Sequence, residues 1–237
     1  MGKYKAILFD MDGTLVPMDM HEFTKGYFVL LGKKLSEYNI PHEKLVATIW
    51  DGTGAMVKND GSKINSEVFW KRFAELIPGL PMDEVEKKCD SFYGNEFIEA
   101  KVFTQDNPLA KEAVRIAHEK AEIVALATNP LFPMAGQITR MKWVDLEEKD
   151  FDLITSYETD YYCKPNPKYF ESVCKRLGVK PQECLMIGND ETEDMYSCSS
   201  IGMDGYLVTD TMIPSKDHPW NGPRGTFKEL IEMLNSL

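Results

Sequence analysis

Two aspartates follow a short apolar run near the start of the chain, in the stretch AILFDMDGTL. The run from Ala6 to Phe9 is typical of a buried strand, and Asp10 and Asp12 come directly after it. Buried carboxylates this close repel each other and lose hydration, so they require a cationic partner. The pair therefore predicts a metal ion or a lysine that faces it from elsewhere in the chain.

Three further apolar runs end in polar residues that suit a binding site. EIVALA is followed by Thr128 and Asn129, FDLITSYE leads to Lys164, and ECLMIG is followed by Asn189 and Asp190. Ligands of open α/β sheets bind outside the carboxyl ends of the strands. A single Asp or Thr after a strand is more often a cap or turn residue. The four breaks together, in this order, specifically predict one site.

The residue types at these breaks suit phosphoryl transfer with a bound cation. Asp10, Asp12 and Asp190 supply the oxygen ligands that Mg²⁺ takes when a few carboxylates and a substrate phosphate hold it. The metal and Lys164 would offset the repulsion between the acids. Mg²⁺ is therefore the predicted cofactor.

The same edge offers groups for each step of phosphate ester hydrolysis. A carboxylate can attack phosphorus and form an aspartyl phosphate. Thr128 and Asn129 can donate hydrogen bonds to phosphoryl oxygens, and Lys164 neutralises developing charge. Asp12, near the leaving group, can protonate it and then activate water, which is typically worth ~10²–10⁴-fold in rate.

The elements around these residues predict an α/β fold. Residues 1–17 and 104–237 alternate short apolar runs with amphipathic stretches, which is typical of βαβ units and a parallel sheet buried on both faces. We expect a Rossmann-like, doubly wound, mainly parallel sheet. Gly178 in RLGVKP should lie just past the end of a helix. One predicted helical face is lined by Leu109, Ala113, Val114, Ile116 and Ala117.

Residues 18–103 have helix-like spacing and no convincing strand, which predicts a separate all-helical block inserted after the first strand. Within it, the glycine-rich stretch DGTGAMVKNDGSK at 51–63 is expected to be a loop. Its aromatic residues are expected to form the block's own core rather than a ligand cage. They are Phe23, Tyr27, Phe28, Phe69, Trp70 and Phe73.

The stretches DMDGTL, ATNP, KPNP and GNDETED resemble the four motifs of the haloacid dehalogenase (HAD) superfamily, which consists mostly of Mg²⁺-dependent phosphatases. The resemblance covers the whole predicted core, 1–17 and 104–237. It implies that 18–103 is the family's helical cap domain, inserted after the first motif. The second aspartate of the first motif speaks against a dehalogenase, because those relatives lack it.

The resemblance also implies roles for individual residues. Asp10 would be the nucleophile, and Asp12 the acid and base whose backbone carbonyl binds Mg²⁺. Lys164 would steady the nucleophile and the phosphate, and Asp190 would be the third metal ligand. The expected phosphate-binding residues are Thr14, Thr128, Asn129 and Lys164.

The fourth motif departs from the family's usual glycine–aspartate, because Gly188 is followed by Asn189 and then Asp190. Asp190 is the preferred metal ligand, since a carboxylate suits Mg²⁺ better than an amide does, and Asn189 is the alternative. Asp194 is then expected to be a hydrogen-bond partner of the ligands rather than a ligand.

Net charge and cysteine content limit the classes of partner and the cellular compartment that we expect. A net charge of -11 argues against nucleic-acid partners. No apolar run approaches the roughly 18 residues of a membrane span, and no signal peptide is recognisable. Five cysteines without a C-x-x-C pair favour reduced thiols in the cytoplasm. We expect a cytoplasmic enzyme whose partner is a small phosphorylated metabolite, whereas its oligomeric state is not readable.

The resulting hypothesis is a Mg²⁺-dependent phosphatase that forms an aspartyl phosphate, and two alternatives stay open. A sugar phosphomutase of the β-phosphoglucomutase type would use the same residues, with a cap that excludes water and holds a bisphosphate. A receiver-like signalling protein is disfavoured, because it carries its acidic pair and its phosphorylated Asp on different strands. A non-catalytic binding protein would need a broken motif, and a dinucleotide site would need a glycine fingerprint after the first strand.

Overall fold

A parallel sheet with strand order β3-β2-β1-β4-β5-β6 forms the centre of the computed structural model, which describes residues 3–237. Successive strands move outward in one direction from β1 to β3 and in the other from β4 to β6, so the sheet is doubly wound. The predicted Rossmann-like α/β fold is confirmed. The strands are β1 Ala6–Phe9, β2 Ile123–Leu126, β3 Leu153–Ile154, β4 Cys184–Gly188, β5 Asp204–Val208 and β6 Arg224–Gly225.

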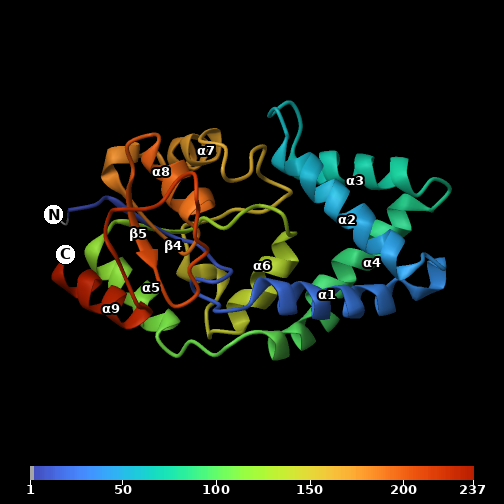
Figure 1. Ribbon diagram of the computed structural model, residues 1–237, viewed down its shortest axis with the longest axis horizontal. Coiled ribbons are helices and arrows are strands. Elements are labelled where there is room, and N and C mark those ends of the chain that lie inside the picture. The colour runs from blue at the N-terminus through green and yellow to red at the C-terminus, as the bar shows by residue number, and fades with distance from the viewer. Residues whose placement is uncertain (1–2) are drawn as a thin grey trace.

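Helices cover both faces of the sheet (Figure 1). Side chains alternate along β1, so that Ile7 and Phe9 pack with α5 and α9 while Ala6 and Leu8 pack with α7 and α8. The apolar runs of the central strands are therefore buried from both sides, as in other parallel sheets. These helices are α5 Ala110–Lys120, α7 Lys168–Leu177, α8 Ser197–Ser199 and α9 Phe227–Ser236.

Short elements connect the larger ones. They are the 3₁₀ turns η3 Glu148–Asp150 and η4 Pro181–Glu183 and the π-helical turn η5 Glu191–Tyr196. Gly178 ends α7 in the left-handed region at φ 67°, as predicted. Strand β6 was not predicted, because its two residues carry no apolar pattern. No helix within residues 3–237 is both long and apolar enough to cross a membrane.

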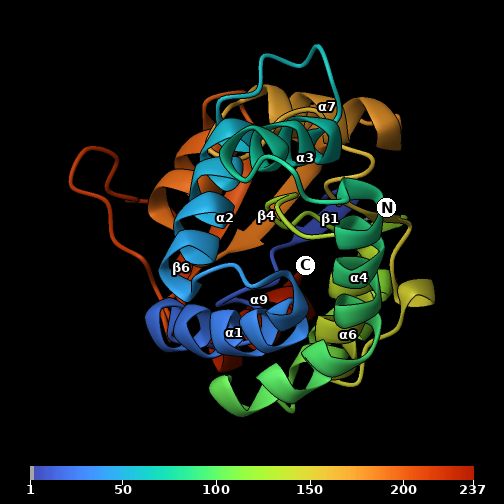
Figure 2. The ribbon, with the colours of Figure 1, turned by 90° about the vertical axis from the view of Figure 1, so that its right-hand side faces the viewer.

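Residues 20–103 form a separate group of helices to the right of the sheet in Figure 1, seen face on in Figure 2. The chain leaves and re-enters the sheet region at neighbouring points, because Gln105 N donates to Pro17 O over 2.8 Å. The proposed boundaries at 18 and 103 stay a prediction. The helices are α1 Met20–Lys34, η1 Ser36–Tyr38, α2 His42–Val57, α3 Asn65–Leu76, α4 Met82–Gly94 and η2 Glu96–Phe103.

The loop expected at 51–63 was wrong for its first half, because α2 continues to Val57. Glycine lowers helix stability by roughly 1 kcal/mol relative to alanine, which made this stretch resemble a loop. At Gly52, however, a Cβ would lie 2.8 Å from the ring of Phe69. The missing side chain lets α3 pack closely on α2, and this packing outweighs the low helix propensity.

Helix α6, Met134–Lys142, connects the sheet to the helical block. The residue after it, Trp143, packs against Phe97 of η2 with ring centroids 5.3 Å apart and against Phe23 of α1 at 6.1 Å. One apolar cluster therefore runs from β1 through α6 into the block. This contact holds the block over the carboxyl ends of the strands.

Candidate active site

Lys164 lies between two carboxylates at the carboxyl edge of the sheet. Its Nζ donates to Asp10 Oδ1 over 2.9 Å and to Asp194 Oδ1 over 2.6 Å, and the lysine is only 1% exposed. Burial by itself would lower the pKa of Lys164, but Asp10 and Asp194 outweigh it and hold the pKa well above its usual value. The cation that the acidic pair required is therefore in part this lysine.

Asp10 follows β1 directly and is itself buried. Burial raises its pKa to about 8, while Lys164 opposes the rise and the charges of Asp194 and Asp12 add to it. Since an attacking carboxylate must be ionised, one lysine shared between two acids leaves this site short of positive charge. A second cation beside Asp10 would correct that deficit.

Oxygen atoms from two adjacent strand ends converge on Thr14. Its Oγ1 lies 3.4 Å from Asp10 Oδ2 and 3.1 Å from Asn189 Oδ1. The approach depends on Gly13, which has φ 85° and where a Cβ would lie 2.2 Å from Asn189 Nδ2. Asn189 Nδ2 in turn donates to Thr211 O over 2.8 Å. The Asn189 amide oxygen thus faces the same space as the Asp10 carboxylate.

Asp190 and Asp194 stabilise the backbone of the fourth motif. Asp190 caps η5, because its Oδ1 accepts from the backbone nitrogens of Thr192 at 2.7 Å and Glu193 at 2.8 Å. Asp194 Oδ2 accepts from the backbone nitrogens of Asn189 and Asp190, each at 3.0 Å. Asp194 therefore joins this turn to Lys164.

The oxygen donors at the edge fit a hard cation, but not as three carboxylates. Residues 3–237 contain no group of three or more His, Cys, Asp or Glu placed to hold a metal ion. The side-chain oxygens that do converge belong to Asp10 and Asn189. A carboxylate and an amide oxygen suit Mg²⁺, which commonly fills its other positions with phosphate and water.

The second and third motifs are joined through Asn129. Its Nδ2 donates to Glu193 Oε2 over 2.8 Å, and its Oδ1 accepts from the backbone nitrogen of Lys164 at 3.2 Å. The carbonyl of Thr128 accepts from Tyr169 Oη at 2.9 Å and from Thr155 Oγ1 at 2.7 Å. The chain thus brings Thr128, Asn129 and Lys164 to one edge, as their order along the chain suggested.

Arg140 is a residue of the site that sequence reasoning missed. It lies on α6, is fully buried, and donates to Asp12 Oδ2 and to Gln137 Oε1. The guanidinium also lies 4.2 Å above the ring of Phe132, while Asp12 Oδ1 is buried and has no hydrogen-bond partner in the part of the chain that the structure describes. The sole signal was weak, namely two polar residues three positions apart, Gln137 and Arg140, which share a helix face.

Comparison with known proteins supports one family. The model of the haloacid dehalogenase-like hydrolases matches residues 4–202. Glyceraldehyde 3-phosphate phosphatase of Methanothermobacter thermautotrophicus is 34% identical over 236 residues, which cover 90% of each chain. Acyl-CoA dehydrogenase family member 10 of Mus musculus is 23% identical over 84% of this chain, which spans only 17% of that protein.

A solved structure agrees with the fold. The HAD-hydrolase YfnB from Bacillus subtilis, in a form bound to magnesium, aligns with a TM-score of 0.61 at 22% identity, covering 98% of this chain and 99% of that one. The resemblance inferred from the four motifs is confirmed, and a receiver-like protein is set aside. The chain belongs to the haloacid dehalogenase-like hydrolases and is an enzyme of that class.

Proposed function

We propose that this enzyme hydrolyses the phosphate monoester of a small metabolite through an aspartyl phosphate on Asp10, with Mg²⁺ as cofactor. The observation that carries the proposal is the buried Asp10, whose one oxygen is held by Lys164 while the other faces Thr14 and Asn189. Lys164 fixes the orientation of the Asp10 carboxylate through Oδ1. The other carboxylate oxygen, Oδ2, can then attack phosphorus. The phosphatase named among the relatives supports the same reaction.

The reaction divides into two displacements at phosphorus. The Asp10 carboxylate attacks, the bond from phosphorus to the ester oxygen breaks, and that oxygen takes a proton from Asp12. Asp12, now ionised, removes a proton from water, which attacks the aspartyl phosphate and releases phosphate and Asp10. Thr128 and Asn129 would donate to the phosphoryl oxygens, and Lys164 would offset their charge.

The bound Mg²⁺ would add the positive charge that Asp10 lacks, and it would polarise the phosphoryl oxygens. The side chain of Asp10, the carbonyl of Asp12 and one residue of the fourth motif would hold it. Of the two candidates there, geometry favours Asn189 over Asp190, because Asn189 Oδ1 and Asp10 Oδ2 approach the same Thr14 hydroxyl, whereas Asp190 Oδ1 caps η5. This reverses the preference drawn from ligand chemistry alone.

Arg140 acts in this scheme as a positioning residue for Asp12. Its guanidinium binds Asp12 Oδ2, so the catalytic proton would reside on Oδ1, the oxygen that has no hydrogen-bond partner among residues 3–237. Arg140 also contacts Gln137 and the ring of Phe132. Because these contacts restrict the guanidinium, its bond to the Asp12 carboxylate should persist. The charge of Asp12 would be stabilised after it gives up its proton.

The test is a screen of purified enzyme against phosphorylated metabolites with Mg²⁺, followed by phosphate release. Acid-quenched protein from a turnover mixture should carry one phosphoryl group on the peptide that contains Asp10, as detected by mass spectrometry. Asp10→Asn should show neither release nor label. Release without any label on that peptide, under conditions where a reference aspartyl phosphate survives, would refute the covalent route.

A further inference from the structure

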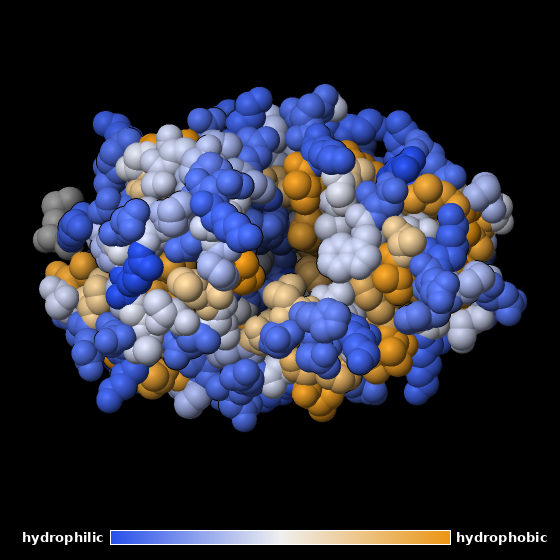
Figure 3. Space-filling view, in the orientation of Figure 1, coloured by the Kyte–Doolittle hydropathy of each residue, from blue (hydrophilic) through white to orange (hydrophobic). Residues whose placement is uncertain are grey.

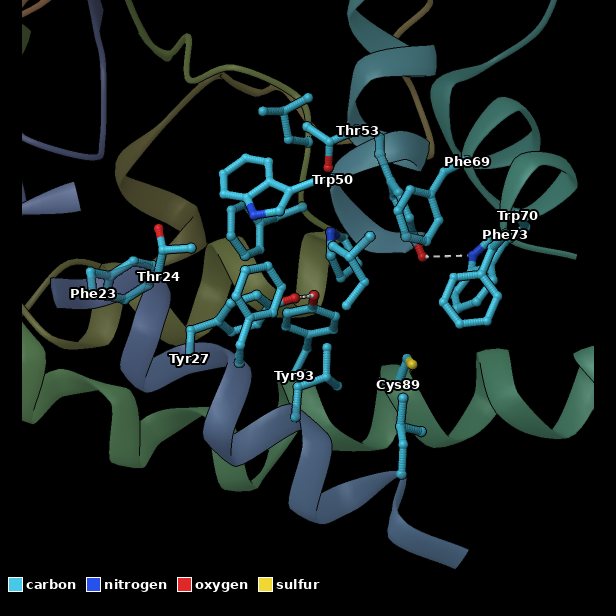
Figure 4. A pocket seen from close by; sticks show the side chains of 18 of the residues that line it. Phe23, Thr24, Tyr27, Trp50, Thr53, Phe69, Trp70, Phe73, Cys89 and Tyr93 are labelled. Carbon is cyan, nitrogen blue, oxygen red and sulfur yellow. Dashed lines mark hydrogen bonds between the residues drawn. The ribbon is translucent and has the colours of Figure 1, made fainter. Parts of the chain in front are cut away.

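An apolar cavity of about 130 Å³ opens between the helical block and the sheet region. Figure 3 shows the hollow between these two parts, with apolar atoms along its walls. Helices α1, α2, α3 and α4 and the loop after Asn129 line it, and Figure 4 shows the rings of Phe23, Tyr27, Trp50 and Phe69 around it. An apolar cavity of roughly 150 Å³ is enough to bind benzene in another protein.

The cavity has aromatic walls and an opening to solvent, which distinguish it from a packing defect in a helical core. Phe23, Tyr27 and Phe73 are buried in one apolar cluster, as the sequence predicted, yet they also form the walls of the cavity. Trp50 lies at the rim and stays 53% exposed, although it packs edge-on against Phe28 with centroids 5.9 Å apart. A concave site with aromatic walls that remains open to solvent is typical of ligand binding.

Phe132 connects the cavity to the group that would protonate the leaving oxygen. It forms part of the cavity wall and follows the second motif by two residues. Arg140 stacks on the ring of Phe132 and binds Asp12. Two contacts, Phe132 to Arg140 and Arg140 to Asp12, therefore connect the wall to the proposed catalytic acid.

No residue that lines the cavity carries a charge. Its polar groups also bind one another, since Tyr27 Oη and Tyr93 Oη are 2.6 Å apart and Trp70 Nε1 donates to Tyr157 Oη over 3.3 Å. A carboxylate or a second phosphate would lose its hydration there without finding a counter-charge. An apolar group would lose nothing comparable and would gain contact with the aromatic walls.

We infer that this cavity binds the organic part of the substrate, and that the leaving group is an uncharged apolar alcohol with an aromatic ring or an alkyl chain of similar size. The inference rests on the proposed phosphatase function and narrows its substrate class. It also disfavours a phosphomutase, because no residue that lines the cavity carries a cation for the second phosphate of a bisphosphate intermediate.

The first test compares two esters with alkyl leaving oxygens, benzyl phosphate and phosphoglycolate, at saturating Mg²⁺. We expect kcat/KM to be at least about tenfold higher for benzyl phosphate. Equal or higher kcat/KM for phosphoglycolate would overturn the inference while leaving the phosphatase function intact.

Variants of α2 test whether the cavity causes the preference. Trp50→Ala should lower kcat/KM for benzyl phosphate about tenfold, mainly through KM, and should lower kcat/KM for phosphoglycolate much less. Thr53→Arg should place a cation at the wall and raise kcat/KM for phosphoglycolate relative to benzyl phosphate. Val29→Ala is the matched control, since Val29 lies on α1, is 59% exposed and does not line the cavity. Equal effects of Trp50→Ala on both esters would contradict the assignment.

Binding separates failure of this inference from failure of the proposed function. Calorimetry with benzylphosphonate, which is not hydrolysed, should detect binding that Trp50→Ala weakens and Val29→Ala does not. If this pattern holds but no ester is turned over, the cavity assignment stands and the phosphatase proposal fails. If benzylphosphonate does not bind while phosphoglycolate is hydrolysed, the cavity assignment fails alone.

Discussion

The carboxyl edge of the sheet and the cavity of the helical block differ in the interactions that hold their side chains. At the edge, charged and polar side chains are held by specific partners, as Lys164 is by Asp10 and Asp194. In the cavity, uncharged rings such as Phe69 and Trp70 meet edge to face, with centroids 5.1 Å apart. In the proposed function, the edge would act on the phosphate group and the cavity would select what that group is attached to.

This difference indicates which amino-acid substitutions each region tolerates. Removing one partner of a buried ion pair leaves an uncompensated charge and costs about 3–5 kcal/mol of stability. Trimming a partly exposed ring at a cavity rim changes shape without leaving a charge unpaired. Reaction type should therefore be hard to alter by single substitutions in this enzyme, and substrate preference should be easy to alter.

Arg140 and Phe132 are the contact between the two regions. One face of Phe132 borders the cavity, and the guanidinium of Arg140 lies on its ring while binding Asp12. A leaving group that presses on Phe132 would act on the position of the acid that must protonate it. Under the proposed roles of Asp12 and the cavity, this arrangement would link substrate fit to proton transfer.

The largest loss of activity is expected from a substitution at the carboxyl edge of the sheet. Asp10→Asn keeps the shape of the side chain and removes the attacking charge, so kcat should fall by at least about 10³-fold. Lys164 keeps Asp194 as its partner, so circular dichroism should be unchanged. Asp106→Asn, whose side chain is 85% exposed, is the control. Phosphate release at a tenth or more of the wild-type rate would exclude Asp10 as nucleophile.

Removal of the metal ion should have the second largest effect on turnover. Phosphate release should vanish in excess chelator and return with Mg²⁺, and Mn²⁺ should substitute because oxygen ligands suit both ions. Binding of benzylphosphonate should weaken less than turnover does, since the cavity contacts need no metal. Undiminished turnover in excess chelator would refute the site as drawn.

A third prediction compares stability in the two regions directly. Lys164→Met leaves the carboxylates of Asp10 and Asp194 without their cation, so the free energy of unfolding should fall by about 3–5 kcal/mol. Trp50→Ala should lower it by less than about 1 kcal/mol, because the ring is half exposed. Urea unfolding of both variants decides the matter, and equal losses would contradict the contrast between edge and cavity.

A fourth prediction concerns the contact between the regions. Arg140→Met should lower kcat about 10²-fold for benzyl phosphate, whose leaving oxygen needs a proton, and much less for p-nitrophenyl phosphate, whose leaving group needs little help. Arg140→Lys should restore part of the loss, because a cation again faces Asp12. A purely structural role would lower both rates alike, and that result would remove Arg140 from the mechanism.

The positions of the motif residues were predictable because strand order places them. Apolar runs identified β1 to β4, and the rule that ligands bind at the carboxyl ends then placed Asp10, Thr128 and Lys164 at one edge. Gly178 was predictable for a local reason, since a helix end needs the left-handed region. In each case a local pattern was sufficient.

The remaining features depend on contacts between distant segments. Arg140 meets Asp12 across 128 residues, and no spacing rule connects them. Gly52 resembled a loop residue until the ring of Phe69 was found against it. Helical spacing likewise identified the aromatic residues of the block without showing that they surround an open space, because packing and enclosure produce the same sequence pattern.

The smallest expected effect concerns the choice between two neighbouring residues of the fourth motif. Ligand chemistry favours Asp190, because a carboxylate brings charge to Mg²⁺. The geometry favours Asn189, whose Oδ1 shares Thr14 with Asp10, whereas Asp190 Oδ1 caps η5. If Asn189 is the ligand, Asn189→Ala should raise the Mg²⁺ concentration for half-maximal activity about tenfold.

Asp190→Ala should then act mainly on stability. Loss of a cap costs about 1 kcal/mol, so the variant should unfold at lower urea while its Mg²⁺ requirement changes little. Asp190→Asn separates the two roles further, since an amide oxygen still accepts from the backbone but carries no charge for the metal. A sharp rise in the Mg²⁺ requirement of Asp190→Asn, with Asn189→Ala nearly unaffected, would restore Asp190 as the ligand. Such a result would mean that the second carboxylate oxygen of Asp190 reaches the metal while Oδ1 keeps its bonds to the backbone nitrogens of Thr192 and Glu193.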